Sequence, residues 1–248
     1  VIQQARMVDL LRAALDRQGV RATIVASEDN DERSAWAAIS NYAPAILSNV
    51  SHIVTHTYSA NDSERLRQLA EKTGKPLWVS EYGDGERSGL RLARRIRNDI
   101  AEKRAQAWIY WQFVDNAGSW GLVNNRLDGR DTSFRLTRKF HVMAQFSRFI
   151  RPGFQIVQAG DNDSLAAYDA GRKQLIIVSV NDQSSERTTI FRLAGLSISA
   201  PMAQAYRTSR LEDVAVQPQL PIKDNSFSAA LPAASVTTFV IAGAELNP

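Results

Sequence analysis

The sequence predicts a chain of two parts, an α/β region over residues 1–150 and an all-β region over residues 151–248. In the first part, short apolar runs alternate with amphipathic helical stretches at the spacing of parallel βα units. Near Arg151, Pro152 and Gly153 the helical periodicity ends, and short alternating runs of strand type follow. With 44% hydrophobic and 23% charged residues, the composition is that of an ordinary soluble globular protein.

The α/β region contains four predicted strands separated by amphipathic helices. The strands are runs rich in β-branched or aromatic residues, at 21–27, 51–58, 76–81 and 105–112. The helices show apolar residues at helical spacing, at 1–18, 34–47, 61–72, 88–103 and 135–149, with Asp62 and Ser63 as candidate caps of the third. A closed (β/α)8 barrel needs eight strands and about 250 residues. Four strands therefore indicate either a small open sheet or half of a barrel.

The all-β region contains seven short strand-like runs separated by turn-forming residues. They lie at 154–157, 165–168, 174–180, 187–193, 203–208, 226–231 and 236–241. Short strands at this close spacing predict an antiparallel β-sandwich.

Composition and motifs argue against several classes of function. The net charge is +4 and the basic residues are dispersed, so we expect no nucleic acid partner. Arg91, Arg94, Arg95 and Arg97 have helical spacing and are predicted to form a solvated helix face. No apolar run is long enough to span a membrane, and the absence of cysteine excludes disulfides and thiolate metal sites. No phosphate-binding glycine motif follows a strand, so we expect no cofactor.

Two other chemistries are weak alternatives. His52 and His56 share a strand face, but they lie at opposite ends of that strand, so we expect no metal site. The segment from Gly85 to Gly89 contains a serine, but its spacing differs from that of a serine hydrolase elbow.

Functional side chains gather where the four predicted strands end. In parallel βα folds these ends share one edge of the sheet, where active sites form. The strand ends and the loops after them carry Glu28, His56, Tyr58, Glu81, Asp84, Trp111, Gln112 and Trp120.

This combination suits carbohydrate chemistry. Glycoside hydrolysis uses two carboxyl groups beside the scissile bond. Aromatic rings such as Tyr58, Trp111 and Trp120 can pack on sugar faces, while His56 and Gln112 can bind hydroxyl groups. Glu81 follows an apolar strand and precedes a glycine turn, which would fix its backbone and leave its carboxylate accessible. The alternative is that Glu81 is a loop carboxylate without a catalytic role.

The segment Pro76–Asp84, with His56 to Tyr58 before it and Trp108 to Gln112 after it, resembles glycoside hydrolase family 30. Within that family it is most similar to endo-β-1,6-galactanase-like members. The resemblance implies a (β/α)8 barrel with an appended β-sandwich, in which the four strands here are strands five to eight. It also implies a retaining mechanism on β-linked glycosides with Glu81 as nucleophile. By the same resemblance, His56, Tyr58 and Trp111 line the subsite of the attacked sugar. From their positions in the sequence, Gln112, Trp120 and Asp84 are further candidate substrate-binding residues.

The family's acid/base glutamate follows an asparagine, and no such pair occurs upstream of Glu81. Glu28 is the best substitute, since it lies two predicted strands before Glu81. Retention needs carboxyl groups roughly 5–5.5 Å apart, whereas strands two apart are separated by roughly 9–10 Å. Glu28 is therefore a candidate acid/base, with a loop carboxylate or a substrate contact as the alternatives.

Half of a barrel would leave two sheet edges and an apolar face exposed, which favours association. We expect a homodimer that covers them, acting on an oligo- or polysaccharide substrate. The alternative is a non-catalytic, carbohydrate-binding or truncated remnant of such an enzyme. We expect an extracellular or periplasmic location, although the first residues are not a signal peptide.

Overall fold

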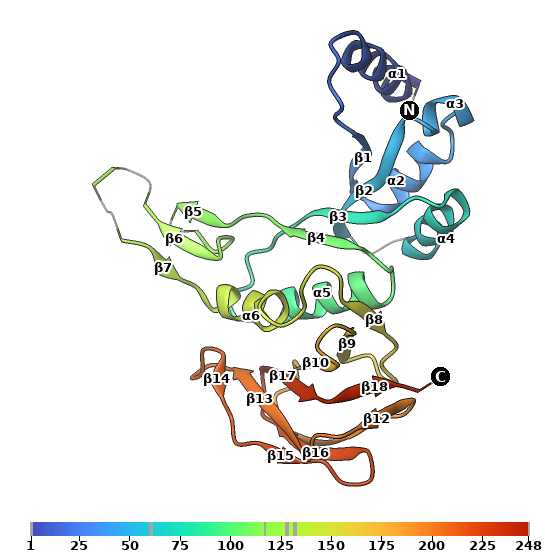
Figure 1. Cartoon of the computed structure of the whole chain (residues 1–248). Coiled ribbons are helices and arrows are strands. Elements are labelled where there is room, and N and C mark those ends of the chain that lie inside the picture. The colour runs from blue at the N-terminus through green and yellow to red at the C-terminus, as the bar shows by residue number, and fades with distance from the viewer. Residues whose placement is uncertain (1, 60–61, 117, 127–128, 131–132, 248) are drawn as a thin grey trace. The chain divides into compact units, whose positions relative to one another are not determined.

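The computed structural model describes residues 2–59, 62–116, 118–126, 129–130 and 133–247 (Figure 1). It contains two compact units. The first comprises the chain up to Gly83 together with Glu102–Trp111, and the second comprises Asp84–Ala101 and the chain from Gln112 onward. The domain boundary near residue 150 stays a prediction.

The first unit is built on a four-stranded sheet, and the sheet confirms the predicted parallel βα pattern. Strands β1 (Ile24–Asp31), β2 (Val50–Ser59), β3 (Leu77–Tyr82) and β4 (Ala107–Tyr110) are all parallel and follow one another in chain order. The helices are α1 (Ile2–Arg17), α2 (Glu32–Ile39), α3 (Pro44–Leu47) and α4 (Ser63–Thr73).

Two details of the helix prediction are wrong. The helix expected over 34–47 is divided into α2 and α3, because Pro44 disfavours helical backbone at the residue before it. Asp62 occupies the cap position of α4 without a side-chain capping bond, and its carboxylate instead accepts a hydrogen bond from Arg33 at 2.7 Å. Asn61, where this helix was expected to begin, lies outside the described residues.

The hydrophobic core of the first unit lies on one face of the sheet. Ile24, Ala26, Ile53 and Leu77 are buried there against residues of α1, α2 and α4. Because side chains alternate along a strand, His52, Val54 and His56 lie on the opposite face. The sheet therefore separates the core from the face that carries the predicted site residues.

The second unit combines two helices with several antiparallel sheets. Its helices are α5 (Leu90–Ala101) and α6 (Arg138–Ser147). Its main sheet has the order β14-β13-β17-β10-β9-β8, and β15 also pairs with β13. These strands are β8 (Gln155–Val157), β9 (Ser164–Asp169), β10 (Gln174–Asn181), β13 (Met202–Thr208), β14 (Ala215–Val216), β15 (Leu220–Pro221) and β17 (Ser235–Ala242). Two further pairs are β11 (Arg187–Arg192) with β16 (Ser226–Leu231), and β12 (Leu196–Ile198) with β18 (Ala244–Leu246).

A small sheet of β5 (Val114–Asn116), β6 (Val123–Asn125) and β7 (Arg135–Leu136) completes this unit. It was not predicted, because strands of two or three residues give too little pattern to recognise. The helix predicted from residue 135 begins at Arg138, since residues 135 and 136 belong to β7.

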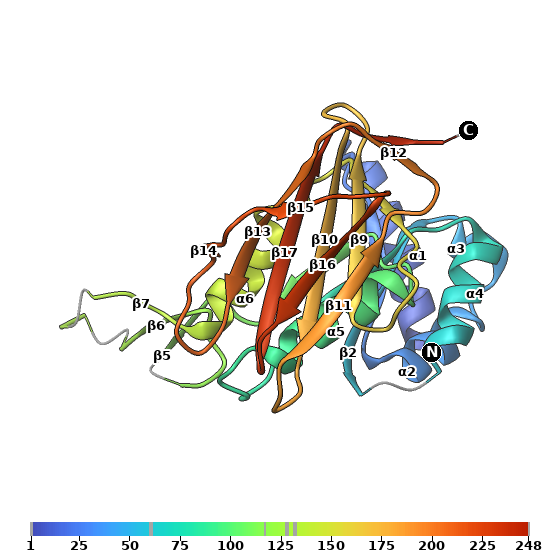
Figure 2. The same cartoon turned by 90° about the horizontal axis from the view of Figure 1, so that it is seen from below.

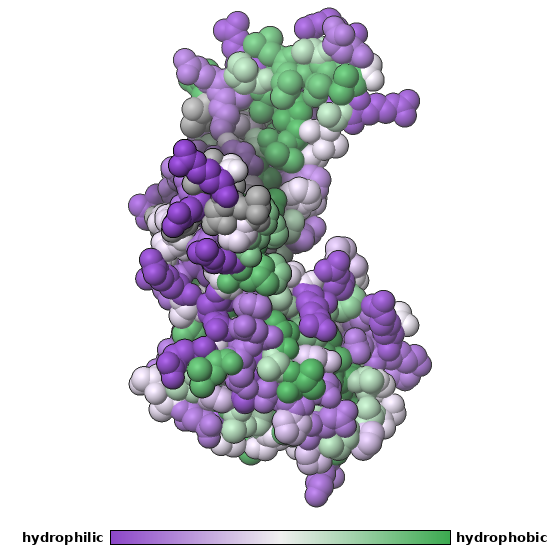
Figure 3. All heavy atoms as spheres, turned by 90° about the vertical axis from the view of Figure 1, so that its left-hand side faces the viewer, coloured by the Kyte–Doolittle hydropathy of each residue, from purple (hydrophilic) through white to green (hydrophobic). Residues whose placement is uncertain are grey.

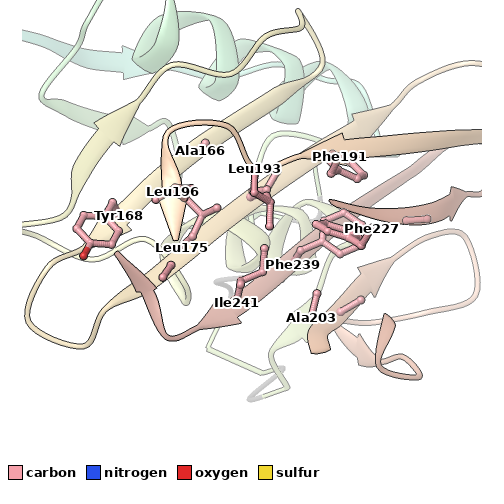
Figure 4. Packing of buried hydrophobic residues seen from close by; sticks show 14 of the residues in the cluster. Ala166, Tyr168, Leu175, Phe191, Leu193, Leu196, Ala203, Phe227, Phe239 and Ile241 are labelled. Carbon is pink, nitrogen blue, oxygen red and sulfur yellow. The ribbon is translucent and has the colours of Figure 1, made fainter. Parts of the chain in front are cut away.

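One hydrophobic core joins the main sheet to the β11–β16 pair, which crosses in front of it in Figure 2. Phe191 of β11, Phe227 of β16 and Phe239 of β17 meet in this core, with ring centroids 4.9 to 5.1 Å apart (Figure 4). Helix α6 is held to the same sheet by Thr238, whose hydroxyl donates to the main-chain oxygen of Gln145 at 2.9 Å. The strands predicted after residue 151 therefore share one antiparallel core.

Two of the four arginines of α5, Arg94 and Arg97, do not belong to the solvated face that their spacing predicted, while Arg91 is exposed. Arg97 is buried, and its guanidinium donates to the main-chain oxygens of Ser164 and Asp161. Arg94 forms ion pairs with Asp163 at 2.7 Å and Asp182 at 2.9 Å. Helical spacing alone could not show this, because the acceptors lie more than 60 residues away in the sequence.

Among the described residues, no helix is long and apolar enough to cross a membrane.

Candidate active site

In the first unit, the strand pairings change register near the carboxyl ends of the strands, where the predicted site residues lie. The pairing of β1 with β2 shifts between Ser27 and Asp29, and the pairing of β2 with β3 shifts between Thr55 and His56. Such irregularities redirect single side chains, and they are common beside active sites. At the first shift, Glu28 has a positive φ of 64°, a conformation that costs free energy in a residue with a Cβ atom.

Glu81 and Tyr58 meet at the end of the sheet, as the sequence analysis expected. The hydroxyl of Tyr58 donates a hydrogen bond to Oε1 of Glu81 at 2.7 Å. Burial raises the pKa of Tyr58, and the hydrogen bond to Glu81 and the charge of that carboxylate raise it further. The phenol therefore stays protonated and remains a donor. The side chain of Glu81 is 25% exposed, so its carboxylate is open to solvent.

His56 lies between two carboxylates. Its Nε2 atom is 3.1 Å from Oε2 of Glu28, which is a hydrogen bond. Its Nδ1 atom is 3.6 Å from Oε1 of Glu81, which is too long for one. Nδ1 is buried, and it has no hydrogen-bond partner in the described part of the chain. Nε2 is therefore hydrogen-bonded to Glu28, whereas Nδ1 lies near Glu81 without a hydrogen bond.

Ser80 also contacts Glu28, which the sequence analysis did not anticipate. Its hydroxyl donates to Oε2 of Glu28 at 2.9 Å, so one carboxylate oxygen accepts from both Ser80 and His56. The available signal was its place directly before Glu81 in the predicted strand. Alternation places Ser80 on the sheet face that carries Trp78, opposite the core.

Aromatic side chains continue the site toward β4. The ring centroids of Tyr58 and Tyr82 are 6.0 Å apart, and those of Tyr82 and Trp108 are 5.9 Å apart. Trp111 is 50% exposed, and its main-chain N–H donates to the oxygen of Tyr82 at 2.8 Å. Trp111 therefore presents an accessible ring at the end of the neighbouring strand, while Trp108 stacks on Tyr110.

The other three predicted substrate-binding residues belong to the second unit. Asp84 is buried, and one of its carboxylate oxygens lies 3.1 Å from Nζ of Lys139. Trp120 is 39% exposed, and its main-chain N–H donates to Asp115 at 3.1 Å. Gln112 accepts a main-chain hydrogen bond from Leu122 at 3.1 Å. Their roles in substrate binding stay predictions.

His52 is engaged in local contacts. Its Nδ1 atom lies 2.8 Å from the hydroxyl of Ser51, and its ring lies 4.4 Å from that of Trp78. The described residues contain no group of three or more histidine, aspartate or glutamate side chains arranged to hold a metal ion.

Comparison with known proteins gives consistent relatives. Residues 2–123 match the model of glycosyl hydrolase family 59. The chain is 31% identical over 253 residues to an endo-β-1,6-galactanase of Hypocrea rufa, covering 100% of this chain and 52% of that protein. It is 28% identical to a glucuronoxylanase of Bacillus subtilis strain 168, covering 80% of this chain and 47% of that protein. These relatives support a GH30-like glycoside hydrolase. The predicted resemblance to family 30 is thus confirmed.

Solved structures agree on the fold of this GH30-like chain. A family 30 subfamily 8 xylanase from Clostridium acetobutylicum matches with a TM-score of 0.76 and 22% identity, over 96% of this chain and 59% of that one. A family 30 endoxylanase from Clostridium papyrosolvens matches with a TM-score of 0.73 and 22% identity, over 90% and 57%. The chain therefore spans about half the length of the relatives it matches.

Proposed function

We propose that the chain carries the nucleophile half of a retaining glycosidase active site, with Glu81 as the nucleophile. The main support is the position of Glu81 at a strand end, where Tyr58 donates to its carboxylate at 2.7 Å and His56 lies beside it. A retaining nucleophile must be ionised and must approach the anomeric carbon. A fixed, partly exposed carboxylate meets both needs.

The proposed substrate is a β-linked polysaccharide of the β-1,6-galactan type or a related one. This proposal is supported by the 31% sequence identity to an endo-β-1,6-galactanase. A second relative is a glucuronoxylanase, which makes a related polysaccharide the other candidate. We also propose an extracellular or periplasmic location, since one structural neighbour is described as an exported protein of Bacteroides fragilis. The exposed ring of Trp111 supplies a surface on which a sugar face can pack.

We further propose that the parallel sheet corresponds to strands five to eight of a (β/α)8 barrel, ending near residue 150. The region after it would be the β-sandwich. Four parallel strands in chain order, with a helical core on one face, support this assignment. The family acid/base glutamate has no counterpart upstream of Glu81. Glu28 remains a candidate for that role.

A homodimer is proposed on the same basis. Strands β1 and β4 are the edges of the sheet, and each pairs with one strand among the described residues. Register and alternation place Val25 and Ile109 on the face opposite the core, where they are 37% and 49% exposed, and Trp111, directly after β4, is 50% exposed. A second copy could cover both the edges and this face.

Trapping of the glycosyl-enzyme intermediate tests the proposed nucleophile. The reagents are dinitrophenyl β-galactoside and β-xyloside with fluorine in place of the hydroxyl beside the anomeric carbon. Dinitrophenolate leaves without a proton donor, so labelling does not need the missing acid/base. We expect mass spectrometry to find one added sugar on the peptide that contains Glu81, and none in Glu81→Gln.

Glu64→Gln is the matched control, because it removes one negative charge from an exposed helix of the same unit. It should label at the wild-type rate. Sugar binding without labelling of the wild-type chain would instead support the alternative, a non-catalytic carbohydrate-binding remnant. Labelling at a carboxylate other than Glu81 would contradict the assignment directly.

A further inference from the structure

We propose that Glu28 is a positioning residue, which fixes the tautomer of His56 so that the ring presents an unprotonated Nδ1 to Glu81. This inference deepens the proposed function and rests on Glu81 being the nucleophile. It assigns Glu28 a role different from that of acid/base, and the experiment below separates the two roles.

The first step concerns the proton on Nε2. An ionised carboxylate can only accept hydrogen bonds, and a neutral imidazole carries one proton on one of its nitrogens. When Glu28 is ionised, the 3.1 Å contact between Nε2 of His56 and Oε2 of Glu28 is a hydrogen bond that places a proton on Nε2. The tautomer of a catalytic histidine is commonly fixed in this way, by the hydrogen bond at its other nitrogen.

The second step concerns Nδ1, the nitrogen that faces Glu81. With the proton on Nε2, the neutral ring has a lone pair on Nδ1. A lone pair does not attract a carboxylate oxygen, and the observed distance of 3.6 Å is longer than a hydrogen bond. The absence of any hydrogen-bond partner for this buried atom among the described residues agrees with the same tautomer.

The third step concerns the consequence for Glu81. A proton on Nδ1 would be drawn to the carboxylate of Glu81 and would add a second hydrogen bond to that from Tyr58. The single bond from Tyr58 fixes the orientation of Glu81, but a second bond to the same oxygen, Oε1, would withdraw further electron density from the attacking carboxylate. Glu28 prevents this by holding the proton on the far side of the ring.

The fourth step concerns the support of Glu28 itself. Ser80 donates to the same oxygen, Oε2, at 2.9 Å, which fixes that oxygen opposite the imidazole. The register shift and the positive φ at Glu28 turn its side chain from the strand toward β2 and β3. Among the described residues, the charged and titratable groups found beside the ring are Glu28 from β1, Tyr58 from β2 and Glu81 from β3.

Nitrogen NMR of the full chain tests the tautomer without requiring activity. The chain has only three histidines, so a sample labelled with ¹⁵N at histidine gives three ring systems. His52→Gln and His141→Gln each remove one of them and assign the third to His56. At neutral pH we expect the proton of His56 on Nε2 in the wild type.

In Glu28→Gln the charged acceptor beside Nε2 is lost, and Glu81 becomes the charged acceptor nearest the ring. We expect the proton to move to Nδ1, with loss of the Nε2–H signal. In Ser80→Ala we expect only part of the His56 population to carry its proton on Nδ1. This substitution removes one hydrogen bond that fixes Glu28 but keeps the charge of Glu28. Glu64→Gln changes the net charge equally and should leave His56 as in the wild type.

The rate of Glu81 labelling by the activated fluoro-sugar is the second measurement. A positioning role predicts at least a tenfold lower rate in Glu28→Gln, by analogy with the loss of a carboxylate that orients a metal-bound histidine. An acid/base role predicts an unchanged rate with this leaving group, and recovery of turnover when azide is added.

A proton on Nδ1 in the wild type, an unchanged tautomer in Glu28→Gln, or the acid/base pattern would overturn the positioning proposal. If the wild type shows Nε2–H but never labels, the proposed function fails while the tautomer assignment stands. The two failures are therefore distinguishable.

Discussion

At position 58 one oxygen atom distinguishes tyrosine from phenylalanine, and that oxygen lies 2.7 Å from the carboxylate of Glu81. Removing it leaves Glu81 without this donor and free to rotate. We expect Tyr58→Phe to lower the rate of Glu81 labelling by roughly tenfold or more, by analogy with the loss of one donor in other active sites. The free energy of unfolding should change little, because Tyr58 is 36% exposed.

Tyr206→Phe is the control, since Tyr206 belongs to the second unit and makes ring contacts with Phe149 and Arg148. Both variants remove one phenol oxygen. Equal labelling rates in the two variants would show that the contact between Tyr58 and Glu81 has no functional importance.

The sequence predicted the residues of this site better than their contacts. Glu81, His56 and Tyr58 could be placed together because parallel strands end at one edge of a sheet. The link from Glu28 through His56 could not be predicted, since it depends on where each strand pair changes register. Such shifts follow from tertiary packing, and a pattern of alternation does not reveal them.

At the scale of elements, a buried ion pair joins α2 to the segment that leads into β4. The ammonium group of Lys103 contacts the carboxylate of Glu32, and both side chains are almost fully buried. Replacing one partner leaves a charge without compensation in a medium of low polarity. We expect Lys103→Met to lower the free energy of unfolding by about 3–5 kcal/mol in urea denaturation.

Arg104→Met gives the matched control, because Arg104 pairs with Glu71 on the surface and is 71% exposed. Arg104→Met should lower the free energy of unfolding by less than about 1 kcal/mol. The double variant Lys103→Met with Glu32→Leu removes both charges and should recover most of the lost stability. A double variant no more stable than Lys103→Met would show that packing, and not the unpaired charge, dominates.

The turn after β13 contains a carboxylate whose ionisation is coupled to folding. Hydrogen bonds from Arg207 are the main cause of a lowered pKa of Glu212, from 4.5 to about 2. Because its pKa is lowered in the folded state, ionised Glu212 stabilises the fold at pH values above the ordinary pKa of 4.5. This stabilisation is lost as the pH falls toward about 2. We expect Arg207→Met to lower the free energy of unfolding by about 1 kcal/mol at neutral pH.

The effect of Arg207→Met should shrink as the pH is lowered from 4.5 toward about 2. Urea denaturation of both proteins across this range measures it. Arg192→Met serves as a control for loss of a strand arginine, since Arg192 is exposed and its pairing in β11 is through the main chain. A difference between wild type and Arg207→Met that persists below this range would refute the coupling to Glu212.

Elements were predictable where their pattern was long enough. The strands and helices of the first unit follow apolar runs or helical periodicity, and each was located to within a few residues. The two-residue strands β7, β14 and β15 were missed, because two residues cannot show alternation. The prediction was wrong for Arg94 and Arg97 of α5 for a related reason, since helical spacing shows which residues share a face and not what packs against that face.

At the scale of the whole molecule, exposed apolar side chains remain on both sides of the first unit. Helix α1 exposes Ile2, Met7, Leu10 and Leu11, and the sheet exposes Val25, Ile109 and Trp111. Figure 3 shows hydrophobic side chains gathered at the top of the view, the height at which α1 lies in Figure 1. Large exposed apolar patches are unusual on proteins that remain monomeric, so these side chains favour association.

The proposed dimer uses the sheet face, and Ile109→Lys tests it. A lysine at this half-exposed position places a charge in the middle of the face, which a second copy could bury only at high cost. We expect sedimentation velocity at micromolar concentration to show a dimer for the wild type. For Ile109→Lys we expect the dissociation constant of the dimer to rise at least tenfold. Leu211→Lys, at an 81% exposed position of the second unit, should sediment as the wild type does.

Equal weakening by a charge on α1, as in Leu10→Lys, would place the contact on the helical side and contradict the proposed geometry. A monomeric wild type would exclude the dimer altogether. The distinction bears on catalysis, because a dimer through the sheet face would bring the partner's carboxylates toward the edge that carries Glu81. In that case Ile109→Lys should lower the rate of hydrolysis of substrates with poor leaving groups, while labelling of Glu81 by the activated fluoro-sugar stays unchanged.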